Sequence, residues 1–143
     1  MRRNVLLLRV SYWSGAALDA AMIIPMLSPR IGGVMFGIEH FAPANDYRYA
    51  MMVGASLMLG RTVLLLWADR KPVERKGVIL ITAVPVVIGM ALAGAYAVNI
   101  GLIRAEKMMP TWLLQAVLLS IFLYSYFAAA RESESPADMS KEI

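Results

Sequence analysis

Two ionisable side chains lie well inside long apolar stretches of this sequence, where a charge is least favourable. Asp19 occurs in VLLLRVSYWSGAALDAAMIIPML, and Arg61 occurs in YRYAMMVGASLMLGRTVLLLW. A charged side chain at the centre of a helix in lipid costs about 2.5–3.5 kcal/mol, so such residues pair with each other or line a polar site. Asp19 and Arg61 are therefore the first candidates for an ion pair or a ligand site.

Gln115 and Tyr12 extend this set of candidates. Gln115 lies in TWLLQAVLLSIFLYSYFAAA, at a depth close to that of Asp19, and Tyr12 offers a hydroxyl group from the same stretch as Asp19. In one interpretation these four side chains line a polar cavity. In the other, Asp19 and Arg61 neutralise each other and hold two helices in register. The sequence leaves both interpretations open.

The residue types that most catalytic and metal centres need are rare in this chain. It has no cysteine and one histidine, which excludes thiolate and iron–sulfur sites and argues against a multi-histidine site. It contains no Walker loop, GxSxG elbow, HExxH pair or Rossmann glycine pattern, and His40 has no motif-bearing nucleophile as a partner. We therefore assign no catalytic residue, no metal and no cofactor.

The composition indicates a membrane protein. Hydrophobic residues make up 59% of the 143 residues and charged residues 17%, against about 45–50% and about 25% in soluble domains. A soluble domain of this size would expose a large apolar patch. Four stretches reach the roughly 20 apolar residues that a spanning helix needs, at about 5–27, 47–67, 78–99 and 111–130. These stretches predict an all-α, integral membrane four-helix transmembrane bundle.

The charges and the tail define the domain limits and the orientation. We expect a single transmembrane domain over residues 1–130 and a polar cytoplasmic tail over 131–143. Basic residues concentrate on the cytoplasmic side of membrane proteins. If both termini face the cytoplasm (N-in/C-in), nine basic residues lie on the cytoplasmic side and four on the outer side, so we predict this orientation. The nine are Arg2, Arg3, Arg9, Arg70, Lys71, Arg75, Lys76, Arg131 and Lys141, and the four are Arg30, Arg48, Arg104 and Lys107.

The same distribution of charge indicates the partners. The net charge is +4, but the basic residues sit in short segments between apolar stretches and form no aromatic-interleaved face. We therefore exclude nucleic acid and expect membrane lipids around a multi-pass protein of the cell (plasma) membrane. The segment RKPVERK is interpreted as a topogenic signal, with binding of anionic lipid headgroups as the alternative.

Small residues mark the helix faces that can approach a neighbour closely. Ser11, Gly15 and Asp19 are spaced by four and share one face of the first helix. Arg61 shares its face with Gly54, seven residues earlier. In the third helix Gly89, Ala93 and Ala97 form a similar stripe. This stripe predicts that the third helix is central and packs its small residues against a neighbouring helix.

The segment 28–46 is long for a link between adjacent helices. Beside the polar Glu39 and His40 it contains five apolar residues: Val34, Met35, Phe36, Ile38 and Phe41. We favour a hydrophobic loop packed over the mouth of the bundle. A short interfacial helix or a re-entrant turn is the alternative.

Three functions fit these features. We favour a non-enzymatic module that binds, carries or scaffolds, with a polar intramembrane site around Asp19 and Arg61. A structural subunit of a larger membrane complex ranks second, with Gln115 as its lipid-facing polar residue. A membrane-embedded enzyme ranks third, for instance a proton-transfer isomerase on an apolar substrate, in which Asp19 would need Tyr12 or Tyr96 as a second group. Because four helices make a thin wall for a pore, transport would require a homo-oligomer.

Overall fold

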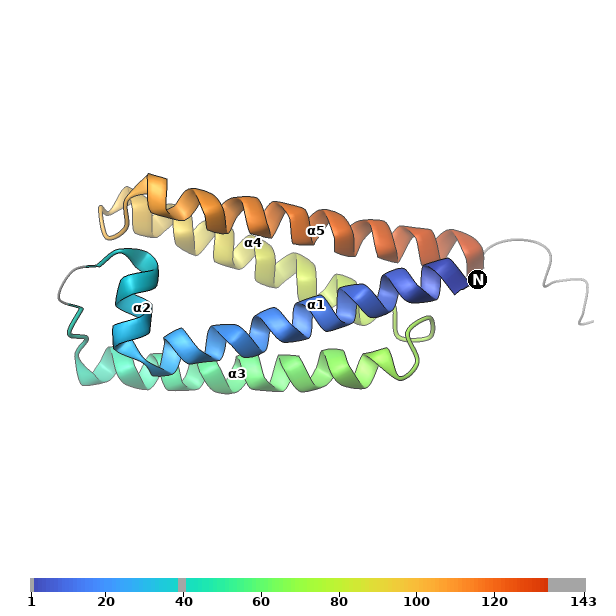
Figure 1. Ribbon diagram of the computed structural model, residues 1–143, viewed down its shortest axis with the longest axis horizontal. Helices are drawn as coiled ribbons and strands as arrows, with labels where there is room; N and C mark the ends of the chain where they lie inside the picture. Colours follow the sequence, from blue (N-terminus) through green and yellow to red (C-terminus); the bar gives the residue numbers. More distant parts are fainter. Residues whose placement is uncertain (1, 39–40, 134–143) are drawn as a thin grey trace, which may run out of the picture.

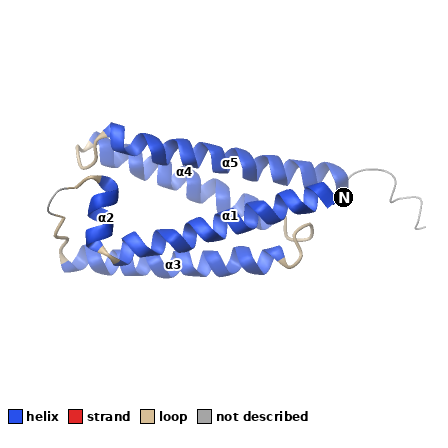
Figure 2. Cartoon of the chain, in the orientation of Figure 1, coloured by secondary structure: helices blue, strands red, loops and turns tan. Residues whose placement is uncertain are grey.

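A computed structural model describes residues 2–38 and 41–133 of the chain. All regular secondary structure in this part is helical (Figure 2). The prediction of an all-α fold is therefore confirmed, and no strand occurs in the described ranges. These two ranges contain four long helices and one short helix (Figure 1): α1 (Arg2–Leu27), α2 (Pro29–Phe36), α3 (Asn45–Asp69), α4 (Gly77–Asn99) and α5 (Ala105–Ser133).

The four long helices contain the four predicted stretches, and each is long and apolar enough to cross a membrane. The shortest, α4, has 23 residues, which at 1.5 Å per residue exceeds the roughly 30 Å of a bilayer's hydrocarbon core. The last helix continues to Ser133, slightly past the expected end of the fourth stretch. The remainder of the expected tail, 134–143, lies outside the described residues.

The short helix α2 corrects our preference for a loop over residues 28–46. Pro29 occupies the first turn, where its fixed φ suits a helix, and Gly37 ends the helix in the left-handed region with a φ of 66°. On the buried face a Cβ at Gly32 would lie 2.9 Å from the Pro25 carbonyl oxygen, so only glycine allows this approach. The apolar segment therefore folds back as a helix across the end of α1 (Figure 1). Glu39 and His40 lie outside the described residues.

The central helix is α1, which packs against α3, α5 and α2, so the prediction that the third long helix is central is wrong. In α4 the expected stripe faces outward, because Gly89 and Ala93 are exposed. The glycine that α4 uses for close packing is Gly94, where an added Cβ would lie 3.1 Å from the Trp112 indole nitrogen of α5. Small-residue spacing identifies a smooth face, and in a membrane protein such a face also suits lipid.

The buried core lies toward the end of the bundle that holds the N-terminus, the α3–α4 turn and the C-terminal end of α5 (Figure 1). It draws on all four long helices through Leu8, Tyr12, Ala16, Leu65, Ala68, Ile79, Ala83, Phe122 and Ala129. Large apolar side chains cover much of the outer surface, with Leu57 71%, Ile81 73% and Leu113 63% exposed. That surface suits lipid rather than water.

The central position of α1 can be tested with one substitution at two glycines. Gly15→Leu should lower the free energy of unfolding by about 1–3 kcal/mol, because even a Cβ added there would lie 3.1 Å from the Leu65 side chain and 3.3 Å from the Phe122 ring. Gly89→Leu should have little effect, since nothing lies within 4 Å of a Cβ at that position. Thermal unfolding in detergent measures both variants, and equal destabilisation would contradict this packing.

Candidate functional site

The small-residue face of α1 is buried and carries the contacts that join three helices. Ser11, Gly15 and Asp19 are all buried, as the spacing predicts. The hydroxyl oxygens of Ser11 and Ser125 lie 2.8 Å apart and join α1 to α5. One turn further along α1, Gly15 makes room for Leu65 of α3 and Phe122 of α5.

Asp19 and Arg61 lie together where α1 packs against α3. The Arg61 Nε is 2.9 Å from the Asp19 Oδ2, and the two side chains are 15% and 9% exposed. The Nε–H direction does not align with Oδ2, so the contact is an ion pair and neither atom has a hydrogen-bond partner in the described part of the chain. Each charge would be costly alone in this apolar setting, and the pair neutralises both.

Tyr12 belongs to a different part of the bundle. Its hydroxyl donates a hydrogen bond of 2.9 Å to the Arg75 carbonyl oxygen in the α3–α4 turn. Tyr12 lies seven residues before Asp19 on α1, a separation of about 10 Å along the helix axis. It therefore fastens α1 to the α3–α4 turn, and the structure does not bring it to the ion pair.

Side-chain contacts hold the basic α3–α4 turn and the end of α3 in place. Asp69 accepts a hydrogen bond of 3.2 Å from the Trp13 indole and lies 3.8 Å from the Arg9 Nε. Arg75 donates to the Trp67 carbonyl oxygen and stacks its guanidinium 3.4 Å from the centroid of the Trp67 ring. The Asp69 contacts join residues far apart in sequence, whereas Arg75 and Trp67 are eight residues apart, and no local motif predicts any of these contacts.

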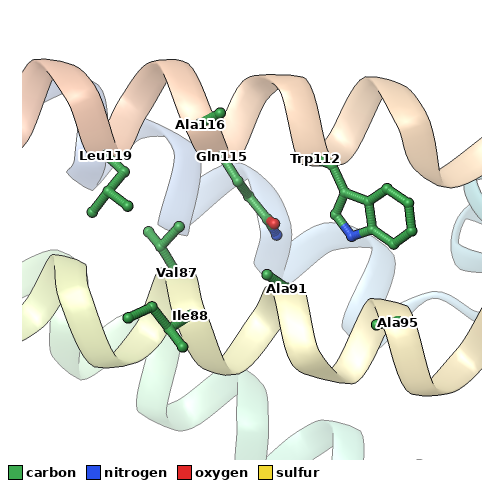
Figure 3. Close-up of a pocket in the computed structure, with 8 residues that line it drawn as sticks. All are labelled: Val87, Ile88, Ala91, Ala95, Trp112, Gln115, Ala116 and Leu119. Carbon is green, nitrogen blue, oxygen red and sulfur yellow. The ribbon is translucent and has the colours of Figure 1, made fainter.

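Gln115 projects from α5 into a groove between α4 and α5 (Figure 3). The residue is 7% exposed, and its Oε1 has no hydrogen-bond partner in the described part of the chain. The groove has a volume of about 320 Å³. Apart from Gln115, its lining is apolar or aromatic and comes from Val87, Ile88, Ala91, Ala95, Trp112, Ala116 and Leu119.

The helix register relates Gln115 to the ion pair. Gly15 of α1 faces Phe122 of α5, and Asp19 follows Gly15 by four residues while Gln115 precedes Phe122 by seven. Because the helices are antiparallel, these steps of about 6 Å and about 10 Å run in the same direction. Asp19 and Gln115 thus lie at similar levels of the bundle, but Gln115 faces the α4–α5 groove. The four sequence candidates therefore divide among three places.

The described residues offer no group of three or more His, Cys, Asp or Glu side chains that could hold a metal ion. Comparisons with protein-family models, with curated proteins and with solved structures found no match for this chain.

A double-mutant cycle tests the ion pair. Asp19→Asn and Arg61→Leu should each cost about 3–5 kcal/mol of stability, because each leaves one charge buried without its partner. The double variant should be less destabilised than the sum of the two, since no lone charge remains. Thermal unfolding in detergent, repeated in lipid bilayers, measures the coupling.

The control is the exposed pair Lys71–Glu74, whose side chains are 57% and 65% exposed. Lys71→Gln should cost about 0–1 kcal/mol, as is usual for a surface pair. Simple additivity in the Asp19–Arg61 cycle would show that the two residues act independently.

Proposed function

We propose that this chain is a non-enzymatic membrane protein that binds an apolar molecule bearing a hydrogen-bond donor, in the groove between α4 and α5. The observation that supports this proposal is the Gln115 Oε1, a buried acceptor that finds no partner among the described residues and lines an otherwise apolar groove. A buried acceptor without a partner costs about 1–3 kcal/mol. A ligand hydroxyl or amine would remove that cost, which favours occupancy of the groove.

The size and lining of the groove define the ligand class. Its volume of about 320 Å³ is at the lower end of the roughly 300–1,000 Å³ of small-molecule sites. Ala91 and Ala95 of α4 and Ala116 of α5 leave the space open, and Trp112 closes one end with an aromatic ring (Figure 3). A single alkyl chain or a small ring system carrying one hydroxyl or amine group fits this description.

The ion pair supports a structural role rather than a second ligand site. The Asp19 and Arg61 side chains face each other and are mostly buried, so their charges are already compensated. This geometry favours the interpretation in which the pair holds α1 and α3 in register. An enzymatic role for Asp19 gains no support, because the Tyr12 hydroxyl is committed to the Arg75 carbonyl oxygen and Tyr96 is 66% exposed.

The role of a structural subunit is a weaker proposal. It relied on Gln115 as a polar residue directed at lipid or at a partner, whereas only 7% of the residue is exposed. The binding proposal, by contrast, uses the Gln115 amide in its buried position beside the groove. Carriage of the ligand across a bilayer would need an assembly of several copies, as four helices enclose little space.

For the orientation, we propose both termini in the cytoplasm and residence in the plasma membrane. The ends of the long helices support this orientation, since the N-terminus, the α3–α4 turn and the end of α5 share one end of the bundle (Figure 1). That end holds the turn with Arg70, Lys71, Arg75 and Lys76, and basic residues favour the cytoplasmic side.

The binding proposal is tested with a photoreactive long-chain alcohol and its methyl ether, which lacks the donor. The alcohol should label the α4 and α5 peptides of the groove about three to ten times more than the ether, as expected for one hydrogen bond in an apolar site. Gln115→Leu should abolish this preference and raise the thermal stability of the ligand-free protein, because it removes an unsatisfied acceptor.

The matched control is Val117→Leu, on the same helix but outside the groove and 55% exposed. It should retain the preference for the alcohol. Equal labelling by alcohol and ether in the unaltered protein, or a preference that survives in Gln115→Leu, would disprove the proposed site.

The orientation is tested with reporter fusions. A reporter that works only in the cytoplasm should be active when fused after Ile143 and inactive when inserted between residues 40 and 45. A reporter that works only outside the cytoplasm should show the reverse. The opposite pattern would reverse the proposed topology, and mixed activity at both positions would show dual insertion.

A further inference from the structure

A second cavity lies where the end of α1, the start of α2 and the start of α3 meet. It is a crevice of about 190 Å³, separate from the groove at Gln115. Its walls include Pro25 and Met26 of α1, Phe41 of the α2–α3 connection, and Met51 and Met52 of α3. Arg48 is the charged residue of its lining. We infer that this crevice binds an anionic membrane phospholipid.

The crevice exists because α2 folds back sharply. The helix α1 ends at Leu27, Ser28 is at the N-cap position of α2, and Pro29 begins α2. Gly32 allows α2 to approach the Pro25 carbonyl oxygen. On the other side of the turn, a Cβ at Gly33 would lie 2.8 Å from the Cβ of Phe41. The two glycines therefore bring α2 close to the end of α1 and to Phe41, and the crevice lies between these residues and the start of α3.

The charge in the lining of the crevice favours an anion. Arg48 is exposed and makes no ion pair with any described residue. By contrast, Arg104 at the same end of the bundle lies 3.3 Å from the Glu106 carboxylate. A guanidinium can donate two parallel hydrogen bonds to a phosphodiester. Phosphatidylcholine carries the same phosphodiester, but Arg48 would repel its quaternary ammonium, so a headgroup with a net negative charge suits the crevice better.

The apolar walls favour a lipid over a free phosphate. Methionine side chains adapt to irregular apolar shapes, and Met26, Met51 and Met52 give the crevice a flexible lining suited to the upper part of an acyl chain. Tyr47 and Tyr49 at the start of α3 are 40% and 71% exposed. Exposed tyrosines at a helix end are typical of the headgroup level of a bilayer. A lipid with its phosphate at Arg48 and its acyl chain along the methionines would thus have both groups at their usual depths in a bilayer.

The experiment uses a photoreactive phosphatidylglycerol with a diazirine high in one acyl chain, at low mole fraction in phosphatidylcholine vesicles containing the full chain. It should label peptides from 22–36 and 41–54 about five times more than photoreactive phosphatidylcholine does. Arg48→Gln should remove most of this difference, and Arg48→Lys should retain part of it. Soluble glycerol phosphate in excess should not compete, which distinguishes a lipid from a free phosphate.

The matched control is Arg104→Gln, which removes the same charge at the same end of the bundle but outside the crevice. It should leave the labelling within about twofold of the unaltered protein, less than the change for a direct contact. Equal labelling by the two lipids, or an equal loss in Arg48→Gln and Arg104→Gln, would overturn the inference. If Arg48→Gln did not fold, the partial loss of labelling in the folded Arg48→Lys protein would replace it. None of these outcomes bears on the groove at Gln115, so the two proposals fail or succeed separately.

Discussion

The close approach of α1 to both α3 and α5 is the contact on which the rest of the structure depends. In an apolar medium helices gain little from burying more apolar surface, so packing of small residues and interhelical polar contacts hold them together. At Gly15 the missing side chain admits Leu65 and Phe122. One turn to either side, Ser11 meets Ser125 and Asp19 meets Arg61. This sequence of polar, small and polar residues sets the register of three helices at once.

The helix α4 is attached differently, and this difference creates the groove. Its main contact is with α5, and its contact with α3 is minor. The seam is tight at Gly94, where Trp112 packs against the backbone. Beside this point Ala91 and Ala95 are too small to reach α5, and space remains between α4 and α5 around Gln115 (Figure 3). The groove thus follows from one helix being held along a single edge.

The sequence was sufficient for features that repeat along a helix and insufficient for those that depend on a neighbour. The lengths of the apolar stretches predicted the four long helices, and the spacing of Ser11, Gly15 and Asp19 predicted a buried face. The outward position of Gly89 could not be predicted, because small residues suit lipid and protein contacts alike. The eight residues of α2 are too few for a clear helical period. That Gln115 faces α4 depends on how α5 is rotated, which local sequence does not encode.

The unsatisfied polar atoms of the interior differ in what lies opposite them. In the described part of the chain, four buried side-chain atoms lack a hydrogen bond: Asp19 Oδ2, Arg61 Nε, Asp69 Oδ1 and Gln115 Oε1. The first two face each other at 2.9 Å, and Asp69 Oδ1 lies 3.8 Å from the Arg9 Nε, so an opposite charge compensates all three. Gln115 Oε1 has no such partner and lies at mid-bundle, where a water molecule would itself be costly to hold among apolar walls. A protein built only for structural stability would gain from leucine at this position. This difference supports the proposal that a molecule enters the groove and donates a hydrogen bond to the Gln115 amide.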